Sequence, residues 1–240
     1  MKTLKGNFGT CYFVDCMNPE IGLPHLEDKS WNCTIIDPPY NIDAKVAQGR
    51  HFNHKREKDV MIYSDLQDTV KYYEWCNTWF QQLKRISQYG YIFCGFTNIG
   101  YWTWEQKCGY LIWHRVNSGN RGFNAFFNTQ EPLITFGTPN RKPMNDIIKI
   151  DIVNGFMSDE KWIHPHPKPR KLIKYLLEGT RAINVLDPMI GSGTTAEIAE
   201  EMGIKWLGFE LEEQYAPDIE KRIKIGIGKH KMYKHQRTLI

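Results

Sequence analysis

Short runs of apolar residues alternate with longer amphipathic stretches along most of the chain. The apolar runs end at glycine, proline or aspartate, which is typical of buried strands. Residues 72–86 instead carry apolar side chains at helical spacing, with Trp75, Trp79, Leu83 and Ile86 on one stripe. In this part of the chain the pattern predicts that helix and strands over residues 32–36, 91–94, 110–113 and 132–136.

The C-terminal part of the chain predicts a regular alternation of strand and helix, over residues 183–186, 194–202, 205–209 and 213–225. Strands that alternate with helices form largely parallel sheets covered on both faces, so we expect a doubly wound α/β fold. The length fits a single domain over residues 1–240. Two polar stretches, approximately 41–65 and 116–160, fit neither pattern and are expected to be functional loops.

The composition is that of a soluble globular protein. Of the 240 residues, 41% are hydrophobic and 24% are charged, and no apolar run reaches the roughly 18 residues of a membrane span. Residues 1–5 lack the apolar core of a signal peptide, so a cytoplasmic protein without membrane contact is expected. Six cysteines without a C-x-x-C pair or a Cys/His cluster predict reduced thiols and no metal site.

A glycine-rich segment follows the predicted strand 183–186. Gly191 and Gly193 permit a tight turn and a close approach of the backbone to a ligand. Glu210 ends the next predicted strand, where a carboxylate can accept both hydroxyls of a ribose. The order of strand, glycine turn, helix, strand and acid predicts a nucleoside cofactor site formed by Asp187, Pro188, Gly191, Ser192, Gly193, Thr194 and Glu210.

The position and charge of this segment favour one cofactor over others. It lacks the lysine of a phosphate-binding P-loop, which argues against a nucleoside triphosphate. NAD fits the glycine pattern, but a dinucleotide fold normally begins with this unit, and here only thirty residues follow Glu210. Asp187 would repel a pyrophosphate and attract an ammonium or a sulfonium. These features favour S-adenosylmethionine (SAM).

The tetrapeptide Asp37-Pro38-Pro39-Tyr40 ends the predicted strand 32–36. The carboxyl ends of parallel strands line one crevice, so Asp37 and Tyr40 are expected to face Gly191. Asp37 and the carbonyl of Pro38 can accept hydrogen bonds from an exocyclic amine and direct its lone pair toward a methyl donor. Tyr40, after two stiff prolines, can stack on a base flipped out of duplex DNA. We therefore expect a catalytic site at Asp37, Pro38, Pro39 and Tyr40.

The tetrapeptide and the glycine-rich segment together resemble the β class of DNA amino-methyltransferases, in which the catalytic motif precedes the cofactor motif. The resemblance implies a Rossmann-like, circularly permuted methyltransferase fold that binds SAM and carries a small, loop-rich target-recognition insertion. It also implies that Asp15, Cys16, Asp37 and Lys168 contact the cofactor. All but Asp37 lie in Val14-Asp15-Cys16-Met17 or in His164-Pro165-His166-Pro167-Lys168-Pro169, which resemble two further family motifs. Val14, His166, Pro167 and Met189 depart from the usual family residues.

The expected activity is SAM-dependent methylation of the adenine N6 amine in DNA. Cytosine N4 is the nearest alternative, because its amine has the same electronics, but family members that act on cytosine more often have serine in place of Asp37. An RNA or protein amine methyltransferase and a catalytically silent binding module are further alternatives. An NAD-dependent oxidoreductase is disfavoured by the position of the glycine segment.

Basic residues in the two polar stretches, or directly before the second, are candidates for DNA binding, because Lys and Arg commonly contact phosphates and base edges. A solvated loop is the alternative for the first stretch. The resemblance to the family further implies a homodimer. The candidate DNA-binding residues are Lys45, Arg50, Lys55, Arg56, Arg115 and Arg121.

Overall fold

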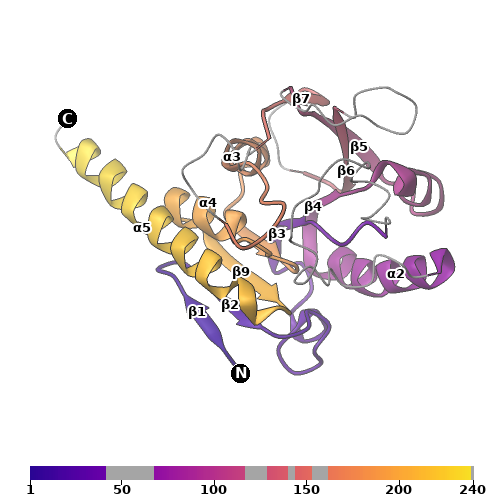
Figure 1. The fold of residues 1–240 in the computed structure, drawn as a ribbon, viewed down its shortest axis with the longest axis horizontal. Helices are drawn as coiled ribbons and strands as arrows, with labels where there is room; N and C mark the ends of the chain where they lie inside the picture. The colour runs from indigo at the N-terminus through magenta and orange to yellow at the C-terminus, as the bar shows by residue number, and fades with distance from the viewer. Residues whose placement is uncertain (42–67, 117–128, 140–143, 153–161, 239–240) are drawn as a thin grey trace, which may run out of the picture.

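The computed structural model describes residues 1–41, 68–116, 129–139, 144–152 and 162–238 (Figure 1). A single nine-stranded sheet runs through the molecule in the order β1-β2-β9-β8-β3-β4-β6-β5-β7. Its strands are β1 (Thr3–Lys5), β2 (Gly9–Phe13), β3 (Trp31–Ile36), β4 (Ser87–Phe93), β5 (Gly109–His114), β6 (Gln130–Gly137), β7 (Ile147–Lys149), β8 (Asn184–Asp187) and β9 (Lys205–Glu210). Its α-helices are α2 (Thr69–Ile86), α3 (Arg170–Gly179), α4 (Thr194–Met202) and α5 (Ala216–Thr238).

The middle of the sheet is parallel. Neighbouring strands pair in parallel from β2 through β9, β8 and β3 to β4, and β6 then pairs antiparallel with both β4 and β5. The chain leaves β3 toward β4 on one side and leaves β8 toward β9 on the other. The adjacent strands β3 and β8 therefore form the topological switch point, which is where open α/β sheets bind ligands.

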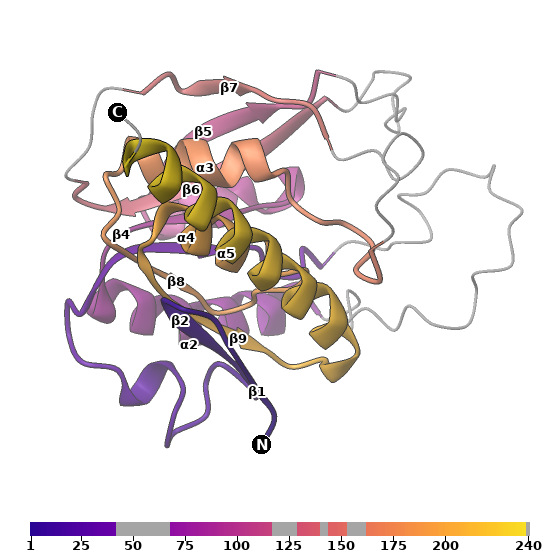
Figure 2. The same ribbon diagram turned by 90° about the vertical axis from the view of Figure 1, so that its left-hand side faces the viewer.

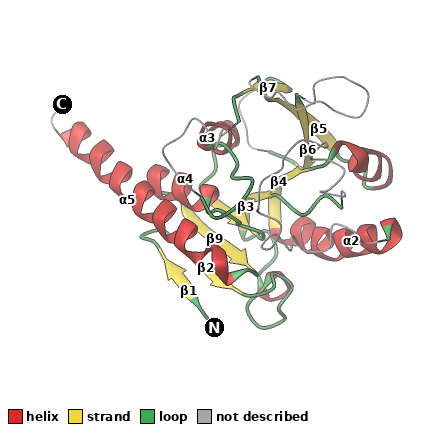
Figure 3. Ribbon diagram, viewed as in Figure 1, coloured by secondary structure: helices red, strands yellow, loops and turns green. Residues whose placement is uncertain are grey.

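Helices cover both faces of the sheet (Figure 3). Helices α3, α4 and α5 pack on one face, where α5 lies across α4 in the second view (Figure 2). Helix α2 packs on the other face together with the π-helical turn Tyr101–Glu105. Strand side chains alternate between these two cores: Tyr91 and Phe93 of β4 join the first, and Ile92 joins the second. The doubly wound α/β class is confirmed.

Local features of the sequence explain where helix α2 begins and which of its faces is buried. The side chain of Asp68 caps its first turn by accepting hydrogen bonds from the backbone N–H groups of Val70 and Lys71. Trp79, Leu83 and Ile86 of its apolar stripe are fully buried and Trp75 is partly buried, and Phe80 meets Trp102 edge to face at a centroid distance of 5.2 Å. Large aromatic side chains packed in this way account for much of the burial on that face.

The strands and helices expected from the sequence are present, with boundaries shifted by a few residues, and α5 extends well past residue 225. The sequence pattern did not predict β1, β2, β7 or α3. Strands β1 and β7 have three residues each, too few to show a period, and α3 lacks a side-chain N-cap.

Part of the expected insertion belongs to the sheet. Strands β6 and β7 lie within residues 116–160, and β6 is paired on both sides because its apolar residues Leu133 and Ile134 are needed in the two cores. Residues 117–128, and residues 42–65 of the other expected loop, lie outside the described residues. Among the helices that the structure describes, none is long and apolar enough to cross a membrane.

We expect Gly90→Ala to lower the free energy of unfolding by about 1–3 kcal/mol. Gly90 of β4 lies opposite Phe136 of β6, and a Cβ at this position would lie 2.2 Å from a ring carbon of Phe136. Urea unfolding measures the loss. The matched control is Gly100→Ala, where a Cβ would meet nothing within 4 Å, so its unfolding free energy should stay near the wild-type value. Equal values for both variants would contradict the steric argument.

Candidate active site

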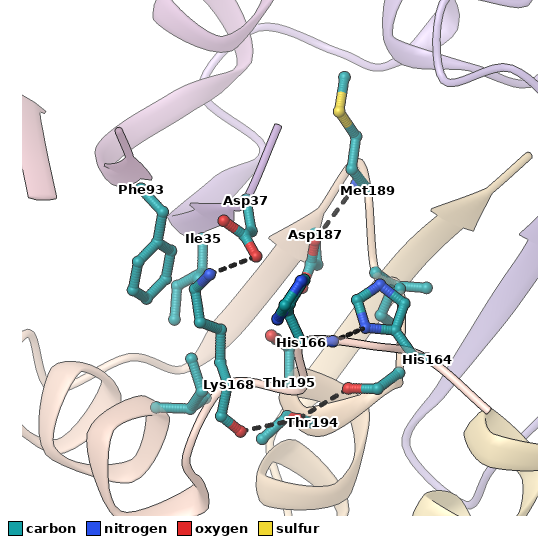
Figure 4. Close-up of a pocket in the computed structure, with 14 residues that line it drawn as sticks. Ile35, Asp37, Phe93, His164, His166, Lys168, Asp187, Met189, Thr194 and Thr195 are labelled. Atoms are coloured by element: carbon teal, nitrogen blue, oxygen red, sulfur yellow. Dashed lines mark hydrogen bonds and ion pairs between the residues drawn. The ribbon is translucent and has the colours of Figure 1, made fainter. Parts of the chain in front are cut away.

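The carboxyl ends of β3 and β8 bring two distant acidic residues together. Thr34 of β3 pairs with Leu186 of β8, so Asp37, just after β3, lies near Asp187, the last residue of β8. A pocket at this edge is lined by both carboxylates, by the segment after β8 and by the segment before α3 (Figure 4). The sequence expectation that Asp37 and the glycine segment share one crevice agrees with this arrangement.

The turn after β8 requires glycine at two positions. Gly191 and Gly193 have φ angles of +51° and +82°, in the left-handed region that glycine favours. A Cβ on Gly191 would lie 2.9 Å from Nε2 of His164, and one on Gly193 would lie 2.9 Å from Cα of Ile219. The backbone of the turn is therefore packed closely between α5 and the segment that precedes α3.

Two buried carboxylates flank this turn. Glu210 accepts hydrogen bonds from the backbone N–H of Gly191 at 2.8 Å and of Glu212 at 2.9 Å. Burial raises the pKa of Asp187 and of Glu210 to about 7, against hydrogen bonds that lower it. The ion pairs of the described residues include neither carboxylate. Asp187 lines the pocket, and Glu210 binds the backbone of the turn that lines it, so the two carboxylates suit a ligand that brings hydroxyl donors and positive charge.

The segment after β2 reaches the same edge of the sheet. Phe13 of β2 pairs with Glu210 of β9, so Asp15 and Cys16 follow directly beside Glu210. Asp15 is exposed and accepts a hydrogen bond from the backbone N–H of Met17. Cys16 is buried, and burial, followed by the charge of Asp15, raises the pKa of its thiol to about 12. The thiol is thus neutral at physiological pH and behaves as an apolar wall.

The catalytic tetrapeptide is held from several elements. The carbonyl of Pro39 accepts the hydroxyl of Tyr72 at 2.8 Å, and the carbonyl of Tyr40 accepts Nδ2 of Asn98 at 2.5 Å. Within the described part of the chain, no hydrogen bond reaches the carbonyl of Pro38. The carbonyls of Pro39 and Tyr40 therefore already accept hydrogen bonds, whereas the carbonyl of Pro38 accepts none from the described residues.

A compact charge network surrounds the tetrapeptide. The Nζ atom of Lys168 lies 2.6 Å from Oδ2 of Asp37 and 3.2 Å from Oε1 of Glu131. The hydroxyl of Tyr40 lies 2.7 Å from Oδ1 of Asp37 and 2.8 Å from Oε1 of Glu131. Arg115 adds a second cation, 3.6 Å from the other oxygen of Glu131. Two acidic and two basic side chains thus balance one another.

The network fixes the protonation of its members. Burial alone would lower the pKa of Lys168, but the charges of Asp37 and Glu131 outweigh it and raise that pKa. Burial and the same two carboxylates raise the pKa of the Tyr40 hydroxyl well above its usual value. Lys168 therefore remains an ammonium and Tyr40 a neutral hydroxyl at physiological pH.

The segment that carries Lys168 is fastened to α5 and to the glycine turn. Oδ2 of Asp218 accepts the backbone N–H groups of Ile163 and His164, each at 2.8 Å. The hydroxyl of Thr194 donates to the carbonyl of Lys168 at 3.2 Å, which leaves Ser192 as the donor to Thr194. The backbone of Lys168 thus joins the glycine turn while its side chain reaches Asp37.

His164 covers Gly191 as a neutral ring. Burial, followed by the charge of Lys168, lowers the pKa of His164 to about 4. The ring meets Tyr215 edge to face at a centroid distance of 4.8 Å. It acts as a packing surface over the turn and carries no charge at physiological pH.

The structure thus gathers the expected catalytic and cofactor residues at one edge of the sheet. Arg115, expected at DNA, pairs with Glu131. Sequence reasoning missed Glu131 and Asp218; a carboxylate beside an apolar strand was the available signal for Glu131. The described residues contain no group of three or more potential metal ligands. Lys45, Arg50, Lys55, Arg56 and Arg121 lie outside the described residues.

We expect Asp187→Asn to raise the free energy of unfolding of the ligand-free protein at pH 8 by on the order of 2 kcal/mol. The folded wild type keeps the Asp187 proton up to about pH 7, whereas an ordinary carboxyl loses it near 3.8. Wild-type stability therefore declines as pH rises between these values. Urea unfolding at pH 5 and pH 8 should show the gain mainly at pH 8, and an equal effect at both would contradict the raised pKa.

Comparison with known proteins extends this picture. The DNA methylase family model of N6 and N4 methyltransferases matches residues 31–221. Type II methyltransferase M.HinfI of Haemophilus influenzae is 25% identical over 88% of this chain and 67% of its own length. Type II methyltransferase M2.LlaDCHI of Lactococcus lactis subsp. cremoris is 35% identical over 48% of this chain and 50% of its own length.

Two solved structures share the fold. The cytosine-N4-specific PvuII DNA methyltransferase has a TM-score of 0.66 and 15% identity, covering 94% of this chain and 92% of that one. M1.HpyAVI in complex with SAM has a TM-score of 0.58 and 20% identity, covering 89% and 98%. The fold is therefore the Rossmann-like methyltransferase fold expected from the sequence. Because the family model matches most of the chain and includes both motifs, this protein belongs to the N6/N4 DNA methylase family.

Proposed function

We propose that this protein is a SAM-dependent DNA methyltransferase that acts on the N6 amine of adenine. The observation that carries the proposal is the meeting of Asp37 with the turn at Gly191 in one pocket, beside a Pro38 carbonyl that has no partner among the described residues. SAM supplies an electrophilic methyl group when bound. Since transfer to an amine is a direct displacement, the protein contributes mainly positioning.

The cofactor half of the pocket fits SAM through the residues of three segments. Glu210 would hold the ribose, and Asp187 would face the positively charged methionine end, because its carboxylate lacks a cationic partner in the described structure. Asp15 and Cys16 lie beside Glu210, on the adenine side. The remaining proposed contacts are the turn and the segment that touches it, namely Pro188, Gly191, Ser192, Gly193, Thr194 and Lys168.

The substrate half would bind the amine of a flipped base. Asp37 would accept one N–H, and the Pro38 carbonyl would accept the other. Tyr40 would stack on the ring, with Pro39 fixing the turn between them. Asp37 and the Pro38 carbonyl would accept hydrogen bonds from the amine, while the neutral Tyr40 hydroxyl lies beside the Lys168 ammonium.

Adenine is favoured over cytosine by the residue at position 37. The family resemblance associates a serine at this place more often with cytosine N4 methylation, and this chain has aspartate. Cytosine N4 is the second candidate, because the PvuII enzyme of similar fold is cytosine-N4-specific.

DNA would meet the protein through the basic residues named from the sequence. Lys45, Arg50, Lys55, Arg56 and Arg121 remain proposals on sequence grounds alone. Arg115 is engaged with Glu131 and with the carbonyl of Gln130, and its part in DNA binding is likewise a proposal on sequence grounds. A homodimer is likewise proposed only from the family resemblance.

The product nucleoside tests this proposal. We expect that the purified protein, incubated with SAM and unmethylated DNA that is then digested to nucleosides, forms N6-methyldeoxyadenosine, identified by mass spectrometry. Asp37→Ala should abolish the product, because the amine loses its charged acceptor, while calorimetry shows SAM affinity retained. N4-methyldeoxycytidine would instead select the second candidate. The absence of both products despite SAM binding would refute DNA amine methylation on this substrate.

The ribose contact has a separate test. We expect Glu210→Ala to weaken SAM binding by about tenfold or more, because hydroxyls of the ribose lose a charged acceptor. Calorimetry measures the dissociation constant, and the thermal unfolding midpoint controls for damage to the turn at Gly191. An unchanged affinity would show that another residue holds the ribose.

A further inference from the structure

The hydroxyl of Tyr40 has one proton and two carboxylate neighbours. Oδ1 of Asp37 and Oε1 of Glu131 lie 2.7 and 2.8 Å from its oxygen, so the proton satisfies only one of them at a time. Lys168 has the same two partners, and its Nζ also lies 3.3 Å from the Tyr40 oxygen. The Tyr40 proton must therefore alternate between the two carboxylates, whereas the Lys168 ammonium can contact both and shift from one to the other.

Binding of an amine at Asp37 creates a conflict with this network. The ammonium of Lys168 lies only 2.6 Å from Oδ2 of Asp37, on an acceptor that the proposed substrate would use. The side chain of Lys168 is only 14% exposed, so releasing its charge without a new partner would be costly. Glu131 lies 3.2 Å from the same ammonium and supplies that partner with a small movement.

We propose that Glu131 is a positioning residue for methyl transfer, which takes over the Lys168 ammonium and the Tyr40 proton while the substrate amine binds Asp37. The inference rests on the proposed function, because it assumes an amine at Asp37. Figure 4 shows Lys168 extending to Asp37 from the segment beside Thr194. The exchange moves no covalent bond: one ammonium and one hydroxyl change their hydrogen-bond partners, and Asp37 remains a carboxylate.

The charges around Lys168 support this role. Arg115 lies 3.6 Å from the oxygen of Glu131 that faces away from Lys168, so Glu131 is held in place when the ammonium moves. His164 and His166 on the Lys168 segment have lowered pKa values, chiefly through burial, and are neutral at physiological pH. Without the charge of Glu131, Asp37 is the one remaining anion that pairs with Lys168 in the described structure.

A double-mutant cycle tests the exchange. Glu131→Gln keeps the size of the side chain and an acceptor for Tyr40 but removes the charge, so Lys168 should compete with the substrate for Asp37. We expect kcat/KM for DNA methylation to fall about tenfold or more in Glu131→Gln, and the loss to be much smaller when Lys168→Gln is also present. The matched control is Glu220→Gln, which removes an exposed ion pair with Lys224 on α5 and should leave kcat/KM unchanged.

The pH profile gives a second readout that a purely structural role would not move. Glu131 raises the pKa of Lys168, so its loss should lower that pKa. The kcat/KM of Glu131→Gln should then rise relative to that of wild type as the pH is raised above neutral, because Lys168 loses its proton at a lower pH in the variant and so frees Asp37. If Lys168→Gln is itself inactive, this profile alone decides.

Three results would overturn the proposal: wild-type kcat/KM in Glu131→Gln, an equal loss with and without Lys168, or parallel pH profiles. Calorimetry with SAM and thermal unfolding midpoints should match wild type in Glu131→Gln, which separates an effect at Asp37 from damage to the cofactor half or the fold. Wild-type protein that binds SAM but methylates neither adenine nor cytosine would instead mark failure of the proposed function.

Discussion

The parallel pairing of β3 with β8 is the contact on which the site depends. Each strand ends in an aspartate near the switch point of the sheet, and the pairing brings Asp37 and Asp187 together although 150 residues separate them. Backbone hydrogen bonds and two apolar cores stabilise this pairing, so the proximity of two carboxylates is maintained by the rest of the fold. Neither acidic residue could hold the other in place by itself, because their charges repel.

The pocket divides into two electrostatic halves. Around Asp37, each anion has a cation, because Lys168 pairs with Asp37 and Glu131, and Arg115 pairs with Glu131. Around Gly191, Asp187 and Glu210 rely on hydrogen bonds from the backbone, and burial raises their pKa values. The first half is therefore complete without a ligand, whereas the second gains most from one that brings positive charge and hydroxyl groups. This asymmetry is what a site for a sulfonium cofactor beside a neutral amine requires.

Helix α5 contributes to the site from outside the sheet. Asp218 fixes the backbone before Lys168, and Ile219 closes the space beside Gly193. Trp162 lies under the guanidinium of Arg222, which pairs with buried Glu197 of α4. The segment that carries Lys168 is thus bound to α5 as firmly as to the glycine turn, and the two halves of the pocket share this one support.

The sequence by itself determined the α/β class, the two motifs and their meeting at one edge, because hydrophobic period, proline and glycine act locally and parallel strands share their carboxyl ends. It did not reveal α3, which lacks a side-chain N-cap, or the strands β1 and β7, which are too short to show a period. Only the tertiary structure decided that Lys168 reaches Asp37, that Glu131 completes the network and that Asp218 holds the loop. These contacts join residues that lie 37 to 131 positions apart in the sequence. Side-chain distances between such residues depend on tertiary packing rather than on any local pattern.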